Sequence, residues 1–135
     1  MAILEIKDDG KILARHIPAE DVWGEGLNFF SANDDFIQVG SWGYPSGKIL
    51  AAHTHNIVDR KVPWTQEVLY VRSGSLLASI YDLSREKVAE IKVLAGDIIV
   101  LLNGGHGYSI LEDNTQVLEI KNGPYAGAEA DRTRL

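Results

Sequence analysis

Short apolar segments recur along this chain from residue 35 onward, and their spacing limits the folds that the chain can adopt. Each segment is rich in Val, Ile, Leu and Tyr, and glycine or Asn/Asp separates neighbours at intervals of about 8–12 residues. None of them shows the 3.6-residue period of a long helix. The pattern predicts an all-β fold, either a sandwich or a barrel. The predicted strands are Phe36–Trp42, Lys48–His55, Gln66–Arg72, Ser75–Tyr81, Lys87–Leu94, Asp97–Leu101, Gly107–Leu111 and Thr115–Lys121.

The remaining segments are predicted to join this β-rich region in one domain. A chain of 135 residues is long enough for a single substantial core. Residues 82–88 lie between two predicted strands and are interpreted as a hairpin connection, and residues 23–30 as a turn-rich connection. The predicted divisions are N-terminal strands within residues 2–17, a helical turn at 18–23, a core over 36–122 and a small, charged surface tail over 123–135.

Composition excludes several classes of function. Cysteine is absent, so disulfides and thiolate metal sites are excluded and any metal must be held by imidazole and carboxylate. The formal net charge is −6 without a long run of either sign, which argues against a nucleic-acid partner. The first residues do not have the pattern of a secretory signal. No apolar stretch approaches the ~20 residues that span a bilayer, so we expect a cytoplasmic protein without a membrane partner.

Two histidines and a glutamate lie near one another in the stretch from Gly47 to Gly74. His53 and His55 are separated by one residue, and alternate residues of a strand point to the same face, so the two imidazoles are expected side by side. Glu67 begins the next predicted strand, on the apolar face that includes Leu69. Two imidazoles near a carboxylate indicate a metal site. The alternative for Glu67 is a strand end that points to water.

A third histidine follows a glycine-rich turn in the C-terminal half. Gly104 and Gly105 permit positive φ and close backbone approach, which lets His106 point inward at the mouth of a barrel. The alternative is a structural histidine in a turn. His16 lies in a strand-like segment without a partner pattern and is interpreted as a surface or core residue.

At these positions the chain resembles the cupin superfamily. Gly47 followed by five residues and His53-Thr54-His55 is similar to the first part of the first cupin motif, and Glu67, six residues and Gly74 to its second part. Gly96 matches the start of the second motif, and His106 lies near that motif's histidine. The resemblance covers about residues 36–122. The sequence segments TQEVLYV, LLNGGHG and EIKNGPYAG also resemble those of small bacterial cupins of unassigned activity.

The resemblance implies a double-stranded β-helix, the jelly-roll barrel of cupins, which commonly binds one divalent metal ion through three histidines and a glutamate. Carried over to this chain, these ligands are His53, His55, Glu67 and His106. Fe, Mn, Ni, Co and Zn ions all suit such a ligand set. The chain departs from the family pattern at three points: eleven residues separate His55 from Glu67 in place of three or four, Leu102 stands where proline is usual, and His106 comes one residue early.

The eleven-residue loop, residues 56–66, is expected to lie over the open positions of the metal. Arg60 and Trp64 in this loop would supply an anion clamp and an apolar wall for a small substrate. Tyr108 shares a strand face with His106 and would supply a pocket hydroxyl. The alternatives are a solvated loop with Trp64 packed on the rim, and a core tyrosine whose hydroxyl is satisfied.

Three functions are consistent with these residues. The first is a metal-dependent enzyme that acts on a small polar or anionic molecule, as an oxygenase or by isomerase or lyase chemistry. The second is a metal-independent sugar-nucleotide isomerase or epimerase, with His53 or His55 as base and Tyr108 as acid. The third is a non-catalytic module that binds a small molecule or a metal. The complete set of ligand types favours the first over the second, and residue types do not separate the first from the third.

Assembly is predicted as a homodimer. Barrels of the resembling type often pair through N-terminal strands, and Ile3–Lys7 alternates in a way that suits addition to the sheet edge of a partner.

Overall fold

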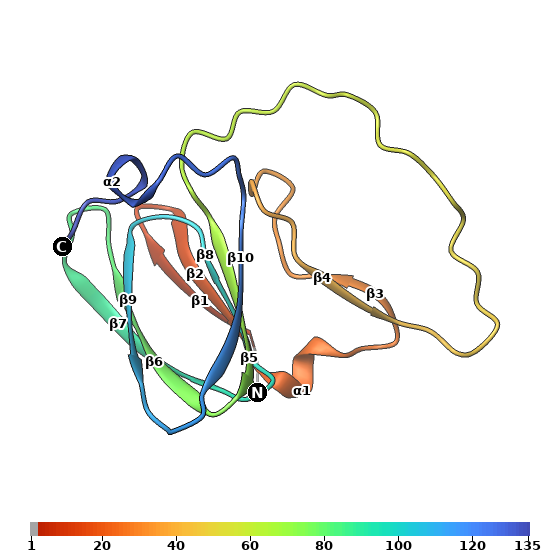
Figure 1. Cartoon of the computed structure of the whole chain (residues 1–135), viewed down its shortest axis with the longest axis horizontal. Coiled ribbons are helices and arrows are strands. Elements are labelled where there is room, and N and C mark those ends of the chain that lie inside the picture. The colour runs from red at the N-terminus through yellow and green to blue at the C-terminus, as the bar shows by residue number, and fades with distance from the viewer. Residues whose placement is uncertain (1–2) are drawn as a thin grey trace.

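The chain folds into antiparallel β-sheets with two four-residue helices (Figure 1). The structure is a computed structural model and describes residues 3–135. It contains three sheets, none of which closes into a barrel among the described residues. The predicted all-β class is therefore confirmed.

The largest sheet has five strands in the order β1-β2-β8-β5-β10, and all neighbours are antiparallel. A second sheet has the order β7-β6-β9, and β3 and β4 form a separate two-stranded hairpin. The strands are β1 Leu4–Asp8, β2 Lys11–Ile17, β3 Gly26–Phe29, β4 Gly40–Gly43, β5 Glu67–Ser73, β6 Ser75–Tyr81, β7 Lys87–Leu94, β8 Ile98–Leu101, β9 Gly105–Ile110 and β10 Gln116–Lys121, and the helices are α1 Ala19–Val22 and α2 Ala128–Asp131.

The main core lies between the five-stranded and the three-stranded sheets. Alternate residues of each strand point to this inner space, as the two-residue period of a strand requires. Leu69 and Val71 of β5 enter it from one sheet, and Leu76, Ala78 and Ile80 of β6 enter it from the other. All five side chains are buried. The two sheets are thus held together by apolar burial across their inner faces.

A second apolar cluster covers the outer face of the five-stranded sheet. Its buried members come from β2, α1, β5, β8 and the residue after β8. The segment between β3 and β4 packs Phe30, Ile37 and Val39 against this cluster. The backbone N–H of Phe36 also donates to Oε1 of Gln66 at 2.7 Å. Residues 30–39 are therefore fixed on the body of the molecule.

Most predicted strands of the C-terminal half are confirmed, and the predicted helical turn after Pro18 is α1. Residues 82–86 connect β6 to β7, as predicted for a hairpin. The predicted strand Phe36–Trp42 is a strand only from Gly40 onward, because residues 36–39 pack on the outer cluster before β4 begins. Two further predictions are wrong. Residues 23–30, expected to be a connection, contain β3, because Gly26–Phe29 pairs with β4. Lys48–His55, expected to be a strand, is neither helix nor strand and has no strand partner among the described residues.

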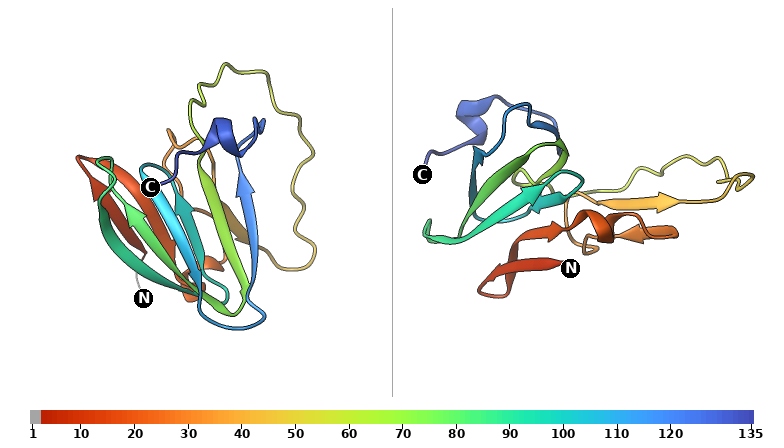
Figure 2. Two further views of the ribbon diagram at one scale, coloured as in Figure 1. Left: turned by 60° about the vertical axis from the view of Figure 1, so that its left-hand side comes forward. Right: turned by 90° about the horizontal axis from the view of Figure 1, so that it is seen from below.

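Residues 44–63, called the arm below, leave the body and return to it (Figures 1 and 2). The arm contains neither helix nor strand, and it follows the β3–β4 hairpin outward before it turns back to β5. Of the predicted N-terminal strand, Ala2 lies outside the described residues, and the part from Leu4 onward forms β1 at one edge of the five-stranded sheet. Neither α1 nor α2 is long and apolar enough to cross a membrane, within residues 3–135.

Candidate functional site

Glu67 lies at the start of β5 and points to the inner face between the two main sheets. Strand parity places it there, because Leu69 and Val71 occupy the same face. Glu67 pairs with Leu101 of β8 on one side and with Lys121 of β10 on the other. It is only 6% exposed. A buried carboxylate is costly unless other groups bind it, so its neighbours determine what it does.

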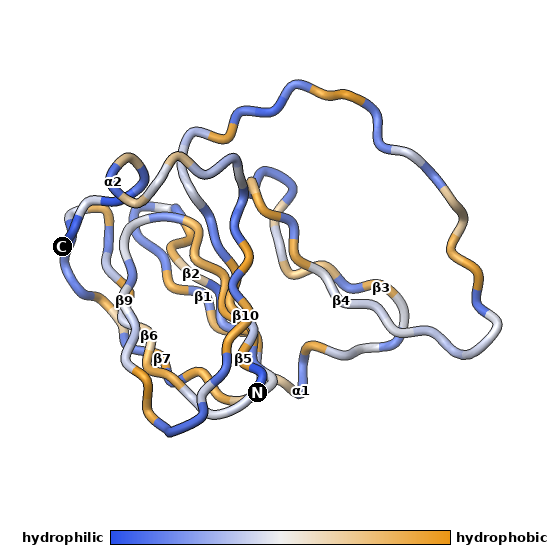
Figure 3. The backbone as a smooth tube through the Cα atoms, viewed as in Figure 1, coloured by the Kyte–Doolittle hydropathy of each residue, from blue (hydrophilic) through white to orange (hydrophobic). Residues whose placement is uncertain are grey.

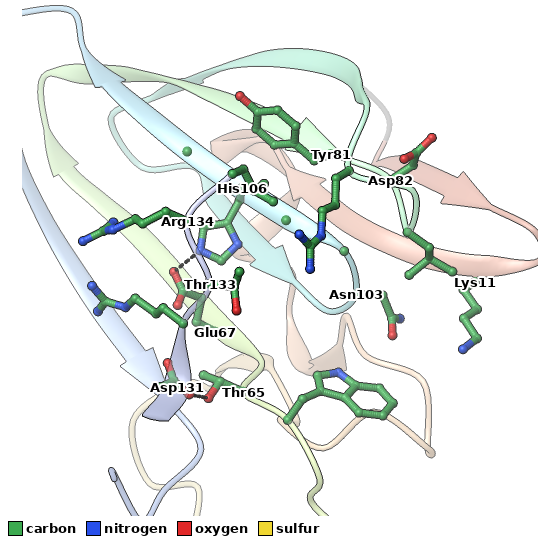
Figure 4. Close-up of a pocket in the computed structure, with 18 residues that line it drawn as sticks. Lys11, Thr65, Glu67, Tyr81, Asp82, Asn103, His106, Asp131, Thr133 and Arg134 are labelled. Carbon is green, nitrogen blue, oxygen red and sulfur yellow. Dashed lines mark hydrogen bonds and ion pairs between the residues drawn. The ribbon is translucent and has the colours of Figure 1, made fainter. Parts of the chain in front are cut away.

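Two residues of β9 bind this carboxylate from the opposite sheet. His106 Nε2 lies 3.2 Å from Oε1 of Glu67 (Figure 4). The Tyr108 hydroxyl donates a hydrogen bond to the same oxygen at 2.9 Å. His106 pairs with Ile80 and Tyr108 with Ala78, so both side chains share the inner face with buried core residues. The sheets therefore present a carboxylate, an imidazole and a phenol to one another.

The three side chains shift one another's pKa values. Burial pushes the pKa of Glu67 upward, but the hydrogen bond and charge of His106, the bond from Tyr108 and the charge of Lys121 outweigh burial and leave this pKa below its usual range. Burial, followed by the charge and hydrogen bond of Glu67, raises the pKa of Tyr108 well above its usual range. Glu67 is thus an anion at neutral pH, and Tyr108 is a neutral donor.

The pKa of Glu67 leads to a prediction for acid stability. Because this pKa is lowered in the folded state, ionised Glu67 contributes stability above the pKa of an unfolded glutamate, and this contribution is lost as the pH falls through the folded-state value. Lowering the pH from about 7 to about 3 should therefore reduce the free energy of unfolding more in the wild type than in Glu67→Gln. Urea denaturation of chelator-treated protein measures this difference. Glu90→Gln, at an exposed carboxylate on β7, serves as the control, and equal pH dependence in the wild type and Glu67→Gln would contradict the prediction.

The turn before β9 fixes where His106 points. Gly104 has φ +73, and a Cβ at this position would lie 2.3 Å from the backbone oxygen of Tyr81. Glycine adopts this conformation without strain, whereas any side chain here would be strained. The Asn103 side chain donates to the backbone oxygen of Ile12 at 2.8 Å and ties this turn to β2. The sequence interpretation of a glycine-dependent turn before His106 agrees with this geometry.

A cavity of about 720 Å³ opens beside Glu67 and His106. Trp64 lines it, and its indole N–H donates to the backbone oxygen of Leu102 at 2.9 Å, while its ring contacts Phe36 at a centroid distance of 4.7 Å. Four cationic side chains contribute to the lining, two of them from the tail; Figure 4 labels Lys11 and Arg134 among them. They are Lys11, Arg85, Arg132 and Arg134.

Sequence reasoning did not identify these four cations. Arg85 lies in the β6–β7 turn, and Arg132 and Arg134 follow α2, in the segment that the sequence predicts as a surface tail. Asp131 of this tail accepts a hydrogen bond from the Thr65 hydroxyl, which holds the tail beside the start of β5. A tail rich in arginine was the available signal, but only the fold shows that it returns to the cavity.

The other predicted site residues lie on the arm. The rings of His53 and His55 are 5.0 Å apart between centroids, and both side chains are exposed. Arg60 is likewise exposed on the arm and does not line the cavity. The structure thus brings Glu67, His106 and Tyr108 together, and leaves His53 and His55 paired with each other at a distance from them. Within residues 3–135, no group of three or more His, Asp or Glu side chains has a metal-binding arrangement.

Comparison of the chain with models of protein families, with curated proteins and with solved structures finds no match in any of the three.

Proposed function

We propose that this chain is a cupin-type protein that holds one divalent metal ion, Fe, Mn, Ni, Co or Zn, and receives a small anionic molecule in the adjoining cavity. The residues that would hold the ion are His53, His55, Glu67 and His106. One observation carries the proposal: His106 Nε2 lies 3.2 Å from Glu67 Oε1 on the inner faces of two different sheets. These residues are 39 positions apart in the sequence, yet their side chains lie next to each other beside the cavity. Two side chains that bind the same metal ion must be this close.

The chemistry of the donors fits a divalent ion. A metal-binding carboxylate must be ionised, and the lowered pKa of Glu67 keeps it so at neutral pH. His53 Nδ1 lies 3.1 Å from the carbonyl oxygen of Ala51. When that nitrogen carries the proton, Nε2 keeps a lone pair for a metal, and such a bond to the second nitrogen is usual for metal-binding histidines.

The sheet order supports a jelly-roll barrel that lacks two strands. β9 ends the three-stranded sheet and β10 ends the five-stranded sheet. One further strand on each would close the space between them and give two antiparallel sheets of the jelly-roll type. Two segments are available for these strands: residues 40–44, which include β4, and Lys48–His55, which the sequence predicts as a strand. The histidines His53 and His55 belong to the second of these segments.

The cavity favours a small anion as the substrate or ligand. Lys11, Arg85 and two tail arginines contribute four positive charges to the lining, against the carboxylates of Glu67, Asp82 and Asp131. A guanidinium presents a planar set of donors that suits carboxylate or phosphate groups. The bound ion would supply Lewis-acid chemistry beside this charge, as in an oxygenase, an isomerase or a lyase. A non-catalytic binding module would use the same residues.

The metal-independent alternative is weaker because of the state of Tyr108. In that alternative Tyr108 gives up its proton as the general acid. Its hydroxyl instead donates to Glu67 at 2.9 Å, and burial beside the carboxylate raises its pKa. A phenol in this state is a poor proton donor near neutral pH.

Elemental analysis tests the proposal. Protein purified without a histidine tag and loaded with each of the five ions in turn should bind one ion per chain. Glu67→Gln and His106→Ala should each weaken binding by at least about 100-fold, since loss of even an outer partner of a ligand costs about 10–100-fold. Glu90→Gln is the matched carboxylate control and should bind like the wild type. Wild-type protein that takes up none of the ions would overturn the proposal.

A further inference from the structure

The two main sheets are open between β9 and β10, and this opening exposes their inner faces. Ile110 of β9 pairs with Leu76 of β6 on the inner face. Leu76 is 1% exposed, but Ile110 is 62% exposed. No other strand within residues 3–135 pairs with the outer edge of β9 or of β10. Both strands therefore present unpaired backbone groups and an uncovered apolar surface, which proteins normally pair or cover.

The arm also has exposed apolar residues, and it has no strand partner within the described residues. Ile49 is 84% exposed, and apolar residues recur along the whole arm (Figure 3). A turn divides the chain here, because the backbone N–H of Lys48 donates to the oxygen of Pro45 at 3.3 Å and Gly47 has φ +93. On one side of this turn, β4 (Gly40–Gly43) has β3 as its single strand neighbour, and on the other side residues 48–55 have no strand partner within the described residues.

We infer that two copies of this chain exchange arms. Residues 40–44 of one copy add to the edge of β10 of the other copy, and residues 48–55 add to the edge of β9. Each copy then completes the two sheets of its partner. The exchange brings His53 and His55 of one copy to Glu67 and His106 of the other, so the site is incomplete in one chain alone. Only this last consequence rests on the proposed metal function.

The base of the arm favours a second copy over the chain's own edges. Residues 30–39 are fixed on the body, by Phe30 and Val39 on the outer cluster and by an ion pair between Arg15 and Asp35 with an Nη1–Oδ2 distance of 2.6 Å. From this base, pairing of β4 with β3 directs the chain outward. The views in Figure 2 show the hairpin and the arm projecting from the body. The second edge of β4 is left to pair with a partner while β3–β4 stays intact.

Charge and symmetry agree with this exchange. The arm holds three cations, Lys48, Arg60 and Lys61, and one anion, Asp59, for a net charge of +2. Residues 105–121, which contain β9 and β10, hold three anions and one cation, for a net charge of −2: Glu112, Asp113, Glu119 and Lys121. Each copy has one arm and one opening. In a two-fold symmetric exchange each arm fills the opening of the other copy, so no arm and no opening remains unpaired.

Cross-linking tests the exchange and does not depend on metal. The chain has no cysteine, so Ala52→Cys on the arm and Ser109→Cys on β9 introduce the only thiols. The double variant, treated with a chelator and then with a flexible bis-maleimide, should give a covalent dimer on a denaturing gel, with peptides around residues 52 and 109 joined. Each single variant should give little dimer. Light scattering of the wild type should give twice the mass of one chain.

Two results would overturn the inference. A link between residues 52 and 109 within one chain would show that the arm closes on its own edges. A monomeric wild type whose double variant forms no cross-link would show that the arm remains free. The metal proposal is judged separately: a linked dimer that binds no ion retains the exchange and rejects the metal site, and a monomer with one ion per chain does the reverse.

Discussion

Two defective chains, mixed in one dimer, are expected to restore one metal site between them. One chain carries His53→Ala and His55→Ala, and so has an intact body but a defective arm. The other carries Glu67→Gln and His106→Ala, and so has an intact arm but a defective body. In the exchanged dimer the intact arm meets the intact body, which forms one complete site, and both defects fall together in the second site.

The measurement uses two different affinity tags that contain no histidine. The chains are expressed together, the mixed dimer is isolated by both tags in turn, and bound metal is determined by elemental analysis. One ion per pair of chains is expected. Each variant purified alone supplies the control, because every site in it lacks half of its ligands and should hold no ion. A mixed dimer without metal would contradict the exchange if the wild type binds one ion per chain.

This result would distinguish an arm that binds metal with its own body from an arm that binds metal with the body of a partner. A single substitution does not distinguish these two cases. A histidine on the arm is required for metal binding whether the arm closes on its own body or on that of a partner. Only the mixed dimer gives different stoichiometries for the two cases. The pattern of His53 and His55 in the sequence contains no information on this choice, because a strand's sequence does not specify which chain supplies its neighbour.

The strands from β5 to β10 were predictable because their determinants are local. Residues 75–81 and 87–94 are rich in Val, Ile, Leu and Ala and are bounded by turn residues, and the structure places β6 and β7 at these positions. β3 was not predictable in the same way. Gly26–Phe29 lies in a turn-rich segment, and its pairing with β4 is what makes it a strand.

Lys48–His55 is the opposite case, because it was predicted as a strand and is not one in the structure. Its residue types suit a strand, but a strand exists only beside an edge that pairs with it, and within the described residues this segment pairs with no edge of its own chain. The position of Glu67 could be predicted only in part from the sequence. Its parity with Leu69 predicted an inward side chain, while the partners that make burial of the carboxylate tolerable, His106 and Tyr108, come from a sheet whose position is set by the tertiary fold.

Gly104→Ala is expected to have the largest effect on stability of any single substitution in the turn before β9. A side chain at Gly104 meets two obstacles. Its φ of +73 is unfavourable for an L residue, which costs about 1–2 kcal/mol. Its Cβ would also lie 2.3 Å from the backbone oxygen of Tyr81, so that the turn or β6 must move. We expect a total loss of about 3–4 kcal/mol in the free energy of unfolding.

Two other glycines separate these contributions. Gly10 has φ +75 but open space around a Cβ, so Gly10→Ala should cost only the conformational part, about 1–2 kcal/mol. Gly107 has open space and no positive φ, so Gly107→Ala should change stability by less than about 0.5 kcal/mol. Urea denaturation of the three variants measures the series. Equal losses for Gly104→Ala and Gly10→Ala would show that the contact with Tyr81 is relieved at no cost. A loss that exceeds that of Gly10→Ala, together with weaker metal binding in the folded Gly104→Ala protein, would show that this turn sets the position of His106 opposite Glu67.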